Sequence, residues 1–125
     1  MTTILLVEDE TLIAMSLAEA LAEAGFTVRC EFEGRRALDA AAQTEFGAAV
    51  VDLGLPDMSG TEVARELRAR YPALPIIVCT AFFSQDLARF VEETRVQFLE
   101  KPVEDSQLVS TLQGLLGGFG RRPLA

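Results

Sequence analysis

Apolar and polar residues follow two spacings along the chain. Five short, mostly apolar runs predict strands at Ile4–Val7, Thr27–Glu31, Ala48–Val51, Ile76–Cys79 and Gln97–Glu100. After each run, apolar residues recur with helical spacing, which predicts helices over about Glu10–Ala24, Gly34–Gln43, Thr61–Arg70, Gln85–Glu93 and Ser106–Leu116. Strands that alternate with helices in this way predict a parallel sheet with helices on both faces.

The strands differ in polarity, and this difference predicts their order in the sheet. The first, third and fourth runs are continuously apolar, as central parallel strands are. The second run alternates polar and apolar residues, and Gln97 and Glu100 flank the fifth, so these two belong at the edges. We therefore expect an α/β, flavodoxin-like (βα)5 fold, a doubly wound parallel sheet of five strands in the order 2-1-3-4-5. Ligands of such sheets bind beyond the carboxyl ends of the strands, near strands 1 and 3.

Composition narrows the class of protein. The 125 residues indicate one domain, which we place at residues 1–116, followed by a flexible Gly/Arg tail or linker stub at 117–125. The net charge of −8 argues against binding to nucleic acid through charge alone. No leader-like segment and no apolar run near about 18 residues is found, so we expect a cytoplasmic protein without a membrane span. Histidine is absent, and Cys30 and Cys79 fall inside strands, where buried free thiols are expected.

The residues that leave the strands carry the candidate chemistry. They are Glu8 and Asp9 after strand 1, Asp52 after strand 3, Thr80 at the end of strand 4, and Lys101 after strand 5. Each has a simple structural explanation: a helix cap for Asp9, a solvated charge for Glu8, a turn for Asp52, a β-branched strand residue for Thr80, and an exposed Lys101. However, the carboxyl ends of parallel strands share one edge, so all five side chains are expected together.

That combination predicts phosphoryl chemistry. Three neighbouring carboxylates repel one another unless a cation lies between them, and Mg²⁺ suits a site made of oxygen ligands. An ammonium group and a hydroxyl complete what a transferring phosphoryl group requires. Asp52 then serves as a carboxylate nucleophile that accepts the phosphoryl group as an acyl phosphate.

Four segments, "ILLVEDE", "VVDLGLPDMSG", "IIVCTA" and "FLEKP", resemble the signature blocks of the response-regulator receiver domain of two-component signalling. The resemblance extends from Thr2 to about Leu116. It implies that a sensor histidine kinase donates a phosphoryl group from a phosphohistidine to Asp52. It further implies that Asp9, Asp52 and the Gly54 carbonyl bind Mg²⁺, with Glu8 acting through water. Thr80 and Lys101 would contact the phosphoryl group. Phe98 would be the aromatic switch residue, and the peptide bond before Pro102 would be cis.

The resemblance also implies how the signal is passed on. Phosphorylation would switch a surface on helix 4, strand 5 and helix 5 that binds an unknown downstream protein. The domain would catalyse only its own phosphorylation and slow autodephosphorylation, as a monomer or a weak phosphorylation-dependent dimer, without direct contact with nucleic acid or membrane. By the same resemblance, Gly54 and Phe82 would flank the path of the hydrolytic water. We leave open whether Phe82 shields the phosphoryl group or forms a docking patch with Phe83.

The sequence departs from the family pattern between Thr80 and Lys101. This stretch is about one residue shorter than expected, and Thr94–Val96 replace a small Gly-Ala pair. We therefore expect a short or irregular fourth helix, which argues against the standard dimer through that helix. Phe98 stands where a tyrosine is usual, and without a hydroxyl it favours an inward, buried ring.

Three other kinds of protein fit parts of this pattern. A phosphatase of the haloacid-dehalogenase type needs its Asp nucleophile after strand 1 with a second Asp two residues later, which Glu8–Thr11 does not provide. A flavodoxin needs a Ser/Thr/Gly-rich phosphate loop there, where three acidic residues would repel the phosphate. A degenerate receiver that only binds partners is disfavoured by the complete set of Asp9, Asp52, Thr80 and Lys101.

Overall fold

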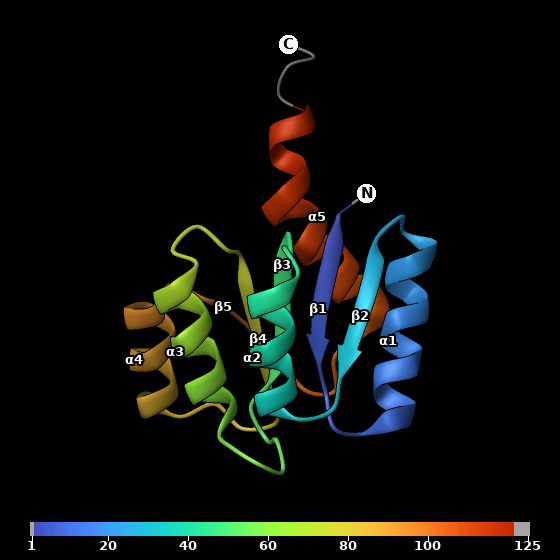
Figure 1. Ribbon diagram of the computed structural model, residues 1–125. Coiled ribbons are helices and arrows are strands. Elements are labelled where there is room, and N and C mark those ends of the chain that lie inside the picture. Colours follow the sequence, from blue (N-terminus) through green and yellow to red (C-terminus); the bar gives the residue numbers. More distant parts are fainter. Residues whose placement is uncertain (1, 122–125) are drawn as a thin grey trace.

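The computed structural model describes the fold of residues 2–121 and the side-chain surroundings of residues 2–116. Strands and helices alternate throughout (Figure 1). The strands are β1 (Thr3–Val7), β2 (Thr27–Glu31), β3 (Ala48–Asp52), β4 (Ile76–Thr80) and β5 (Gln97–Glu100). The helices are α1 (Thr11–Glu23), α2 (Gly34–Gln43), α3 (Gly60–Arg70), α4 (Gln85–Thr94) and α5 (Asp105–Arg121).

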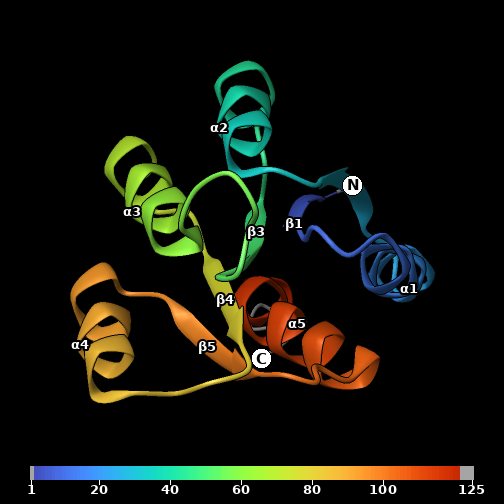
Figure 2. The same cartoon turned by 90° about the horizontal axis from the view of Figure 1, so that it is seen from below.

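The strands form one parallel sheet in the order β2-β1-β3-β4-β5, which confirms the predicted fold and strand order. Every residue of β3 is buried, whereas β2 and β5 contain exposed and half-buried residues, as expected of edge strands. All five carboxyl ends lie at the same edge of the sheet, the lower edge in Figure 1, which faces the viewer in Figure 2.

Helices cover both faces of the sheet (Figure 2), and one cluster of buried apolar side chains lies on each face. Alternate residues of a strand point to opposite faces, so neighbours on β1 serve different layers. Ile4 and Leu6 pack with residues of α1 and α5, while Leu5 and Val7 pack with residues of α2, α3 and α4. Because both faces of β1 and β3 are covered, the end of each strand is fixed in position.

Helix α4 is an unbroken helix of ten residues, so the expectation of an irregular fourth helix was wrong, although α4 is as short as α2. Its start is capped, since the Leu87 N–H donates to Ser84 Oγ at 3.1 Å. Arg95 follows its last residue in the left-handed conformation, with a φ of 58°, and ends the helix. A backbone turn at Arg95 thus takes the place of the small residues expected there.

Helix α5 is longer than predicted. It runs to Arg121, whereas the spacing of apolar residues predicted an end near Leu116. Residues 117–121 of the predicted tail therefore lie in this helix, and residues 122–125 lie outside the part of the chain that the structure describes. Among the described helices, none combines the length and the apolar character needed to cross a bilayer.

Candidate functional site

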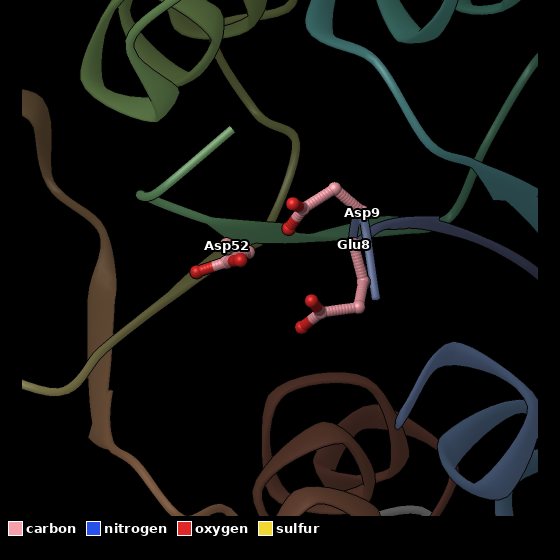
Figure 3. Close-up of side chains that lie close together, drawn as sticks. All are labelled: Glu8, Asp9 and Asp52. Atoms are coloured by element: carbon pink, nitrogen blue, oxygen red, sulfur yellow. The ribbon is translucent and has the colours of Figure 1, made fainter. Parts of the chain in front are cut away.

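Two neighbouring strands bring three carboxylates together at the carboxyl edge. Glu8 and Asp9 follow the last residue of β1, and Asp52 ends β3, which pairs with β1 through Val7 and Val51. One oxygen from each carboxylate lies within 4.8 Å of the other two. Figure 3 shows the three groups arranged around one common space.

The acidic cluster is not a group of solvated surface charges. Glu8 is only 3% exposed and Asp52 only 5%, because Glu8 follows β1 and Asp52 ends β3, two strands that are covered on both faces. Burial raises the pKa of Glu8, and the neighbouring charge of Asp52 acts in the same direction. A hydrogen bond from the Glu10 N–H to Glu8 Oε2 and the charge of Lys101 oppose that rise in pKa. The reading of Glu8 as a solvated loop residue was therefore wrong.

Lys101 reaches this cluster from the edge strand. Its Nζ lies 3.0 Å from Asp52 Oδ1 and 3.5 Å from Glu8 Oε1. Partial burial by itself lowers the pKa of Lys101, but the hydrogen bonds and charges of Asp52 and Glu8 outweigh burial, so that the pKa is raised. The Lys101–Pro102 peptide bond is cis, the isomer that the resemblance implies. Lys101 is thus held as a cation beside two buried carboxylates rather than exposed to solvent.

The loop after β3 leaves room beside Asp52. The Gly54 N–H donates to Asp52 Oδ1 at 3.2 Å, so Asp52 also shapes the turn that follows it. A Cβ atom added at Gly54 would meet only that oxygen, at 4.0 Å. Asp9 is not needed as a helix cap, because the N-cap residue of α1 is Glu10 and no side chain caps that helix.

These residues fit a magnesium ion by their chemistry. Carboxylate and backbone carbonyl oxygens are the protein ligands that Mg²⁺ prefers, and the ion usually takes only one or two carboxylates directly. Asp9 and Asp52 supply carboxylates from adjacent strands, and Gly54 lies in the open part of the loop. Three clustered carboxylates with one nearby ammonium also leave an excess of negative charge for a cation to offset.

The hydroxyl of Thr80 lies at the same edge but is turned into the following loop. Its Oγ1 accepts a hydrogen bond from the Phe82 N–H at 3.2 Å and donates to the Phe82 carbonyl at 3.3 Å. The next residue, Phe83, packs against Phe98 with their ring centroids 4.7 Å apart. Phe98 is half-buried rather than fully buried, and the Phe82 ring is 78% exposed. The loop after β4 thus connects the candidate site to Phe98.

One residue that organises this edge was not predicted from the sequence. Asp57, in the loop between β3 and α3, accepts hydrogen bonds from the N–H groups of Gly34 at 2.8 Å and Arg35 at 2.9 Å, at the start of α2. A signal was present in the sequence: residue Glu33, just before α2, is not a favoured capping residue, so the helix needs a cap from elsewhere.

Comparison with known proteins agrees with this geometry. The sequence model of the response regulator receiver domain matches residues 4–113. This chain belongs to the response-regulator receiver family. The receiver is 35% identical over 116 residues to the transcriptional regulatory protein CreB of Escherichia coli, and 34% identical over 114 residues to the two-component response regulator PhoP of Pseudomonas aeruginosa. These matches cover 91% and 90% of the chain but 50% and 51% of the relatives, so the chain spans about half of their length.

Solved structures resemble the receiver over nearly their whole length. The chemotaxis protein CheY4 of Vibrio cholerae superimposes with a TM-score of 0.86 and 28% identity, covering 93% of this chain and 99% of that one. A CheY-like receiver domain protein of Methanospirillum hungatei has a TM-score of 0.91 and 25% identity, with 98% of each chain covered. The fold and the two-component class of the receiver rest on these similarities together.

Proposed function

We propose that the receiver accepts a phosphoryl group on Asp52 from the phosphohistidine of a sensor histidine kinase, with Mg²⁺ bound beside it. The observation that carries this proposal is the contact of 3.0 Å between Lys101 Nζ and Asp52 Oδ1 at the edge of the acidic cluster. It supports the proposal because Asp52 as the nucleophile, the Lys101 cation and the acidic cluster as a metal site would then share one small space, as phosphoryl transfer requires.

The two oxygens of Asp52 take different roles in this reaction. Oδ1 contacts Lys101 and the Gly54 N–H, which leaves Oδ2 as the nucleophile. As the bond from Oδ2 to phosphorus forms, the bond between phosphorus and the imidazole nitrogen breaks, and that nitrogen keeps the electron pair. The other ring nitrogen keeps its proton, so histidine leaves as a neutral imidazole. Lys101 offsets the negative charge on the phosphoryl oxygens.

Asp9, Asp52 and the Gly54 carbonyl would hold the metal directly, and Glu8 would act through water. When bound, Mg²⁺ supplies positive charge to the phosphoryl oxygens and orients them. Of the two acidic residues after β1, Glu8 suits the indirect role better than Asp9, because Glu8 is more deeply buried and its two oxygens contact Lys101 and the Glu10 N–H. Slow autodephosphorylation of Asp52 would be the only other reaction that the domain catalyses. We therefore propose a signalling domain rather than an enzyme.

Phosphorylation of Asp52 would change the conformation of the loop after β4, which would pass the signal to the surface of the domain. When Thr80 Oγ1 turns to the phosphoryl group, it gives up its two hydrogen bonds with the backbone of Phe82. The loop then shifts, and the contact of Phe83 with the switch residue Phe98 changes with it. The surface of α4, β5 and α5 would present this change to a downstream protein. The receiver itself would be a monomer or a weak phosphorylation-dependent dimer.

The relatives suggest the kind of output. CreB is named as a transcriptional regulatory protein and is about twice as long as this chain. We therefore propose that a protein containing this receiver regulates transcription. We also propose that it is cytoplasmic. The net charge of −8 disfavours direct contact between the receiver itself and DNA or RNA.

The intact mass of the protein after incubation with acetyl phosphate and Mg²⁺ tests the proposal. We expect one added phosphoryl group in the wild type and none in Asp52→Asn. Continuous release of phosphate without a stable adduct would indicate a phosphatase instead. An unchanged mass in both proteins would indicate a receiver that only binds partners.

A further inference from the structure

Asp57 joins the candidate metal loop to a different helix. The residue lies in the loop between Asp52 and Gly60, yet its two carboxylate oxygens accept hydrogen bonds from the N–H groups of Gly34 and Arg35. These partners are 23 and 22 residues away in the sequence. They are also the first two N–H groups of α2, which lack partners within the helix.

Close packing supports the same junction. A Cβ atom at Gly34 would collide with the side chain of Met58, so the loop lies directly on the first residue of α2. At the end of the loop, a Cβ atom at Gly60 would collide with the backbone of Asp52 and Leu53. The loop is therefore fixed where it leaves β3 and where it enters α3, and Asp57 fixes the part between.

We propose that Asp57 is a positioning residue that holds this loop so that the Gly54 carbonyl faces the carboxylates of Asp9 and Asp52. The proposal rests on the proposed function, because it assumes that Gly54 contributes a ligand to Mg²⁺. A backbone carbonyl has no side-chain rotamer of its own, so only the path of the loop can place it. Mg²⁺ demands near-ideal octahedral geometry, which makes its affinity sensitive to a small displacement of one ligand.

The charge of Asp57 suits this role. Hydrogen bonds from the N–H groups of Arg35 and Gly34 lower the pKa of Asp57, so the carboxylate is ionised when Mg²⁺ is bound. It does not approach the metal ligands as a further charge, since both of its oxygens face α2.

A coupling between the two sites distinguishes this role from a simple helix cap. If the hydrogen bonds of Asp57 to Gly34 and Arg35 favour Mg²⁺ binding by holding the loop, then Mg²⁺ binding must in turn stabilise these hydrogen bonds. Coupling between two sites is reciprocal. Hydrogen exchange at these two amides then slows on addition of Mg²⁺. A cap that serves only α2 leaves their exchange unchanged.

The test is an NMR titration of the full chain with MgCl₂, in which amide shifts give the Kd and hydrogen exchange is followed at Gly34 and Arg35. The variants are Asp57→Ala and the milder Asp57→Asn, which keeps one acceptor oxygen. Arg36→Gly is the control for a weaker α2, since it costs up to about 1 kcal/mol of helix stability without touching the loop. Asp39→Asn, at an exposed position of α2, is the control for the loss of one negative charge.

We expect Asp57→Ala to raise the Kd for Mg²⁺ by roughly tenfold, near the lower end for residues that orient a ligand. The Kd of Asp57→Asn for Mg²⁺ should lie between those of Asp57→Ala and the wild type. The Kd of each control, Arg36→Gly and Asp39→Asn, should stay within about twofold of the wild-type value. The slowing of exchange at Gly34 and Arg35 should be present in the wild type and absent in Asp57→Ala. A wild type that binds Mg²⁺, with an unchanged Kd in both Asp57 variants, would overturn the positioning role alone. A wild type that does not bind Mg²⁺ would overturn the proposed function as well.

Discussion

Lys101 Nζ and the Gly54 N–H meet the same oxygen of Asp52, at 3.0 Å and 3.2 Å from Oδ1. One carboxylate oxygen is thereby contacted by two groups, one from Lys101 directly after β5 and one from the loop after β3. The other oxygen is left for chemistry. Since Glu8 and Asp9 add two more carboxylates, a single ammonium does not balance the charge of the cluster.

Magnesium should therefore stabilise the fold. Mg²⁺ binds the folded cluster and relieves the repulsion among its carboxylates, so millimolar Mg²⁺ should raise the melting temperature. The gain is about 1.4 kcal/mol when the ion is present at ten times its Kd. Asp9→Ala should remove both the repulsion and the response to Mg²⁺. Melting curves with and without the ion measure this, and a full response in Asp9→Ala would contradict the assigned ligands.

Arg68 should be important for the stability of α4. Its guanidinium donates to the carbonyls of Leu74 at 2.6 Å, Thr94 at 2.9 Å and Arg95 at 2.8 Å, which joins the ends of α3 and α4. Arg68→Ala leaves these carbonyls without their charged donor and should cost about 2–3 kcal/mol of unfolding free energy in urea titrations. The control is Arg70→Ala, which breaks a half-exposed pair with Glu66 and a long hydrogen bond of 3.5 Å to the Leu38 carbonyl, and should cost less than about 1 kcal/mol.

Acid should weaken the link between Asp57 and α2. The pKa of Asp57 is lowered from 3.8 by the Arg35 and Gly34 N–H groups, so its contribution to stability is complete above pH 3.8. That contribution is lost as the pH falls through the folded-state pKa, where the carboxyl takes up a proton. The difference in unfolding free energy between the wild type and Asp57→Asn should shrink over this range. A difference that stays constant would mean that ionised Asp57 does not hold the helix.

Phe82 should influence how long the phosphorylated state lasts. Neither Gly54 nor Phe82 offers a polar side chain to orient the attacking water, so phosphorylated Asp52 should hydrolyse slowly. Phe82→Glu can hold a water and should hydrolyse severalfold faster, as measured by phosphate loss from purified protein in excess Mg²⁺. If the apolar ring shields the site, Phe82→Ala should also hydrolyse faster than the wild type. Equal rates in all three would favour a docking patch, for which the 78% exposure of Phe82 leaves room.

The sheet could be predicted because its signals are local. Continuous apolar runs mark β1, β3 and β4, and the residue that ends each run then falls at one edge by the geometry of a parallel sheet. The same geometry predicts that the charged residues of the candidate site, which end or follow these strands and β5, gather at that edge. The repeated glycines of α5 suggested an early end, since glycine is a weak helix former, but α5 continues past them.

The hydrogen bonds that could not be predicted from the sequence join distant parts of the chain. Asp57 caps a helix that begins 23 residues earlier, and Arg68 binds carbonyls 26 and 27 residues later. The hydroxyl of Thr80 was expected at the site, but its direction is decided by a hydrogen bond to the backbone of Phe82. Such contacts depend on packing in three dimensions, and no periodic pattern in the sequence reports them.

The most direct test locates the phosphoryl group on the chain. Acetyl phosphate and Mg²⁺ are used to phosphorylate the protein, borohydride reduces the acyl phosphate to an alcohol, and peptide mass spectrometry identifies the reduced residue. If Asp52 is the phosphoacceptor, homoserine appears at position 52 only, and Lys101→Ala lowers its yield under the same conditions. Reduction at Glu8 or Asp9, or no reduced residue at all, would contradict the assignment of Asp52.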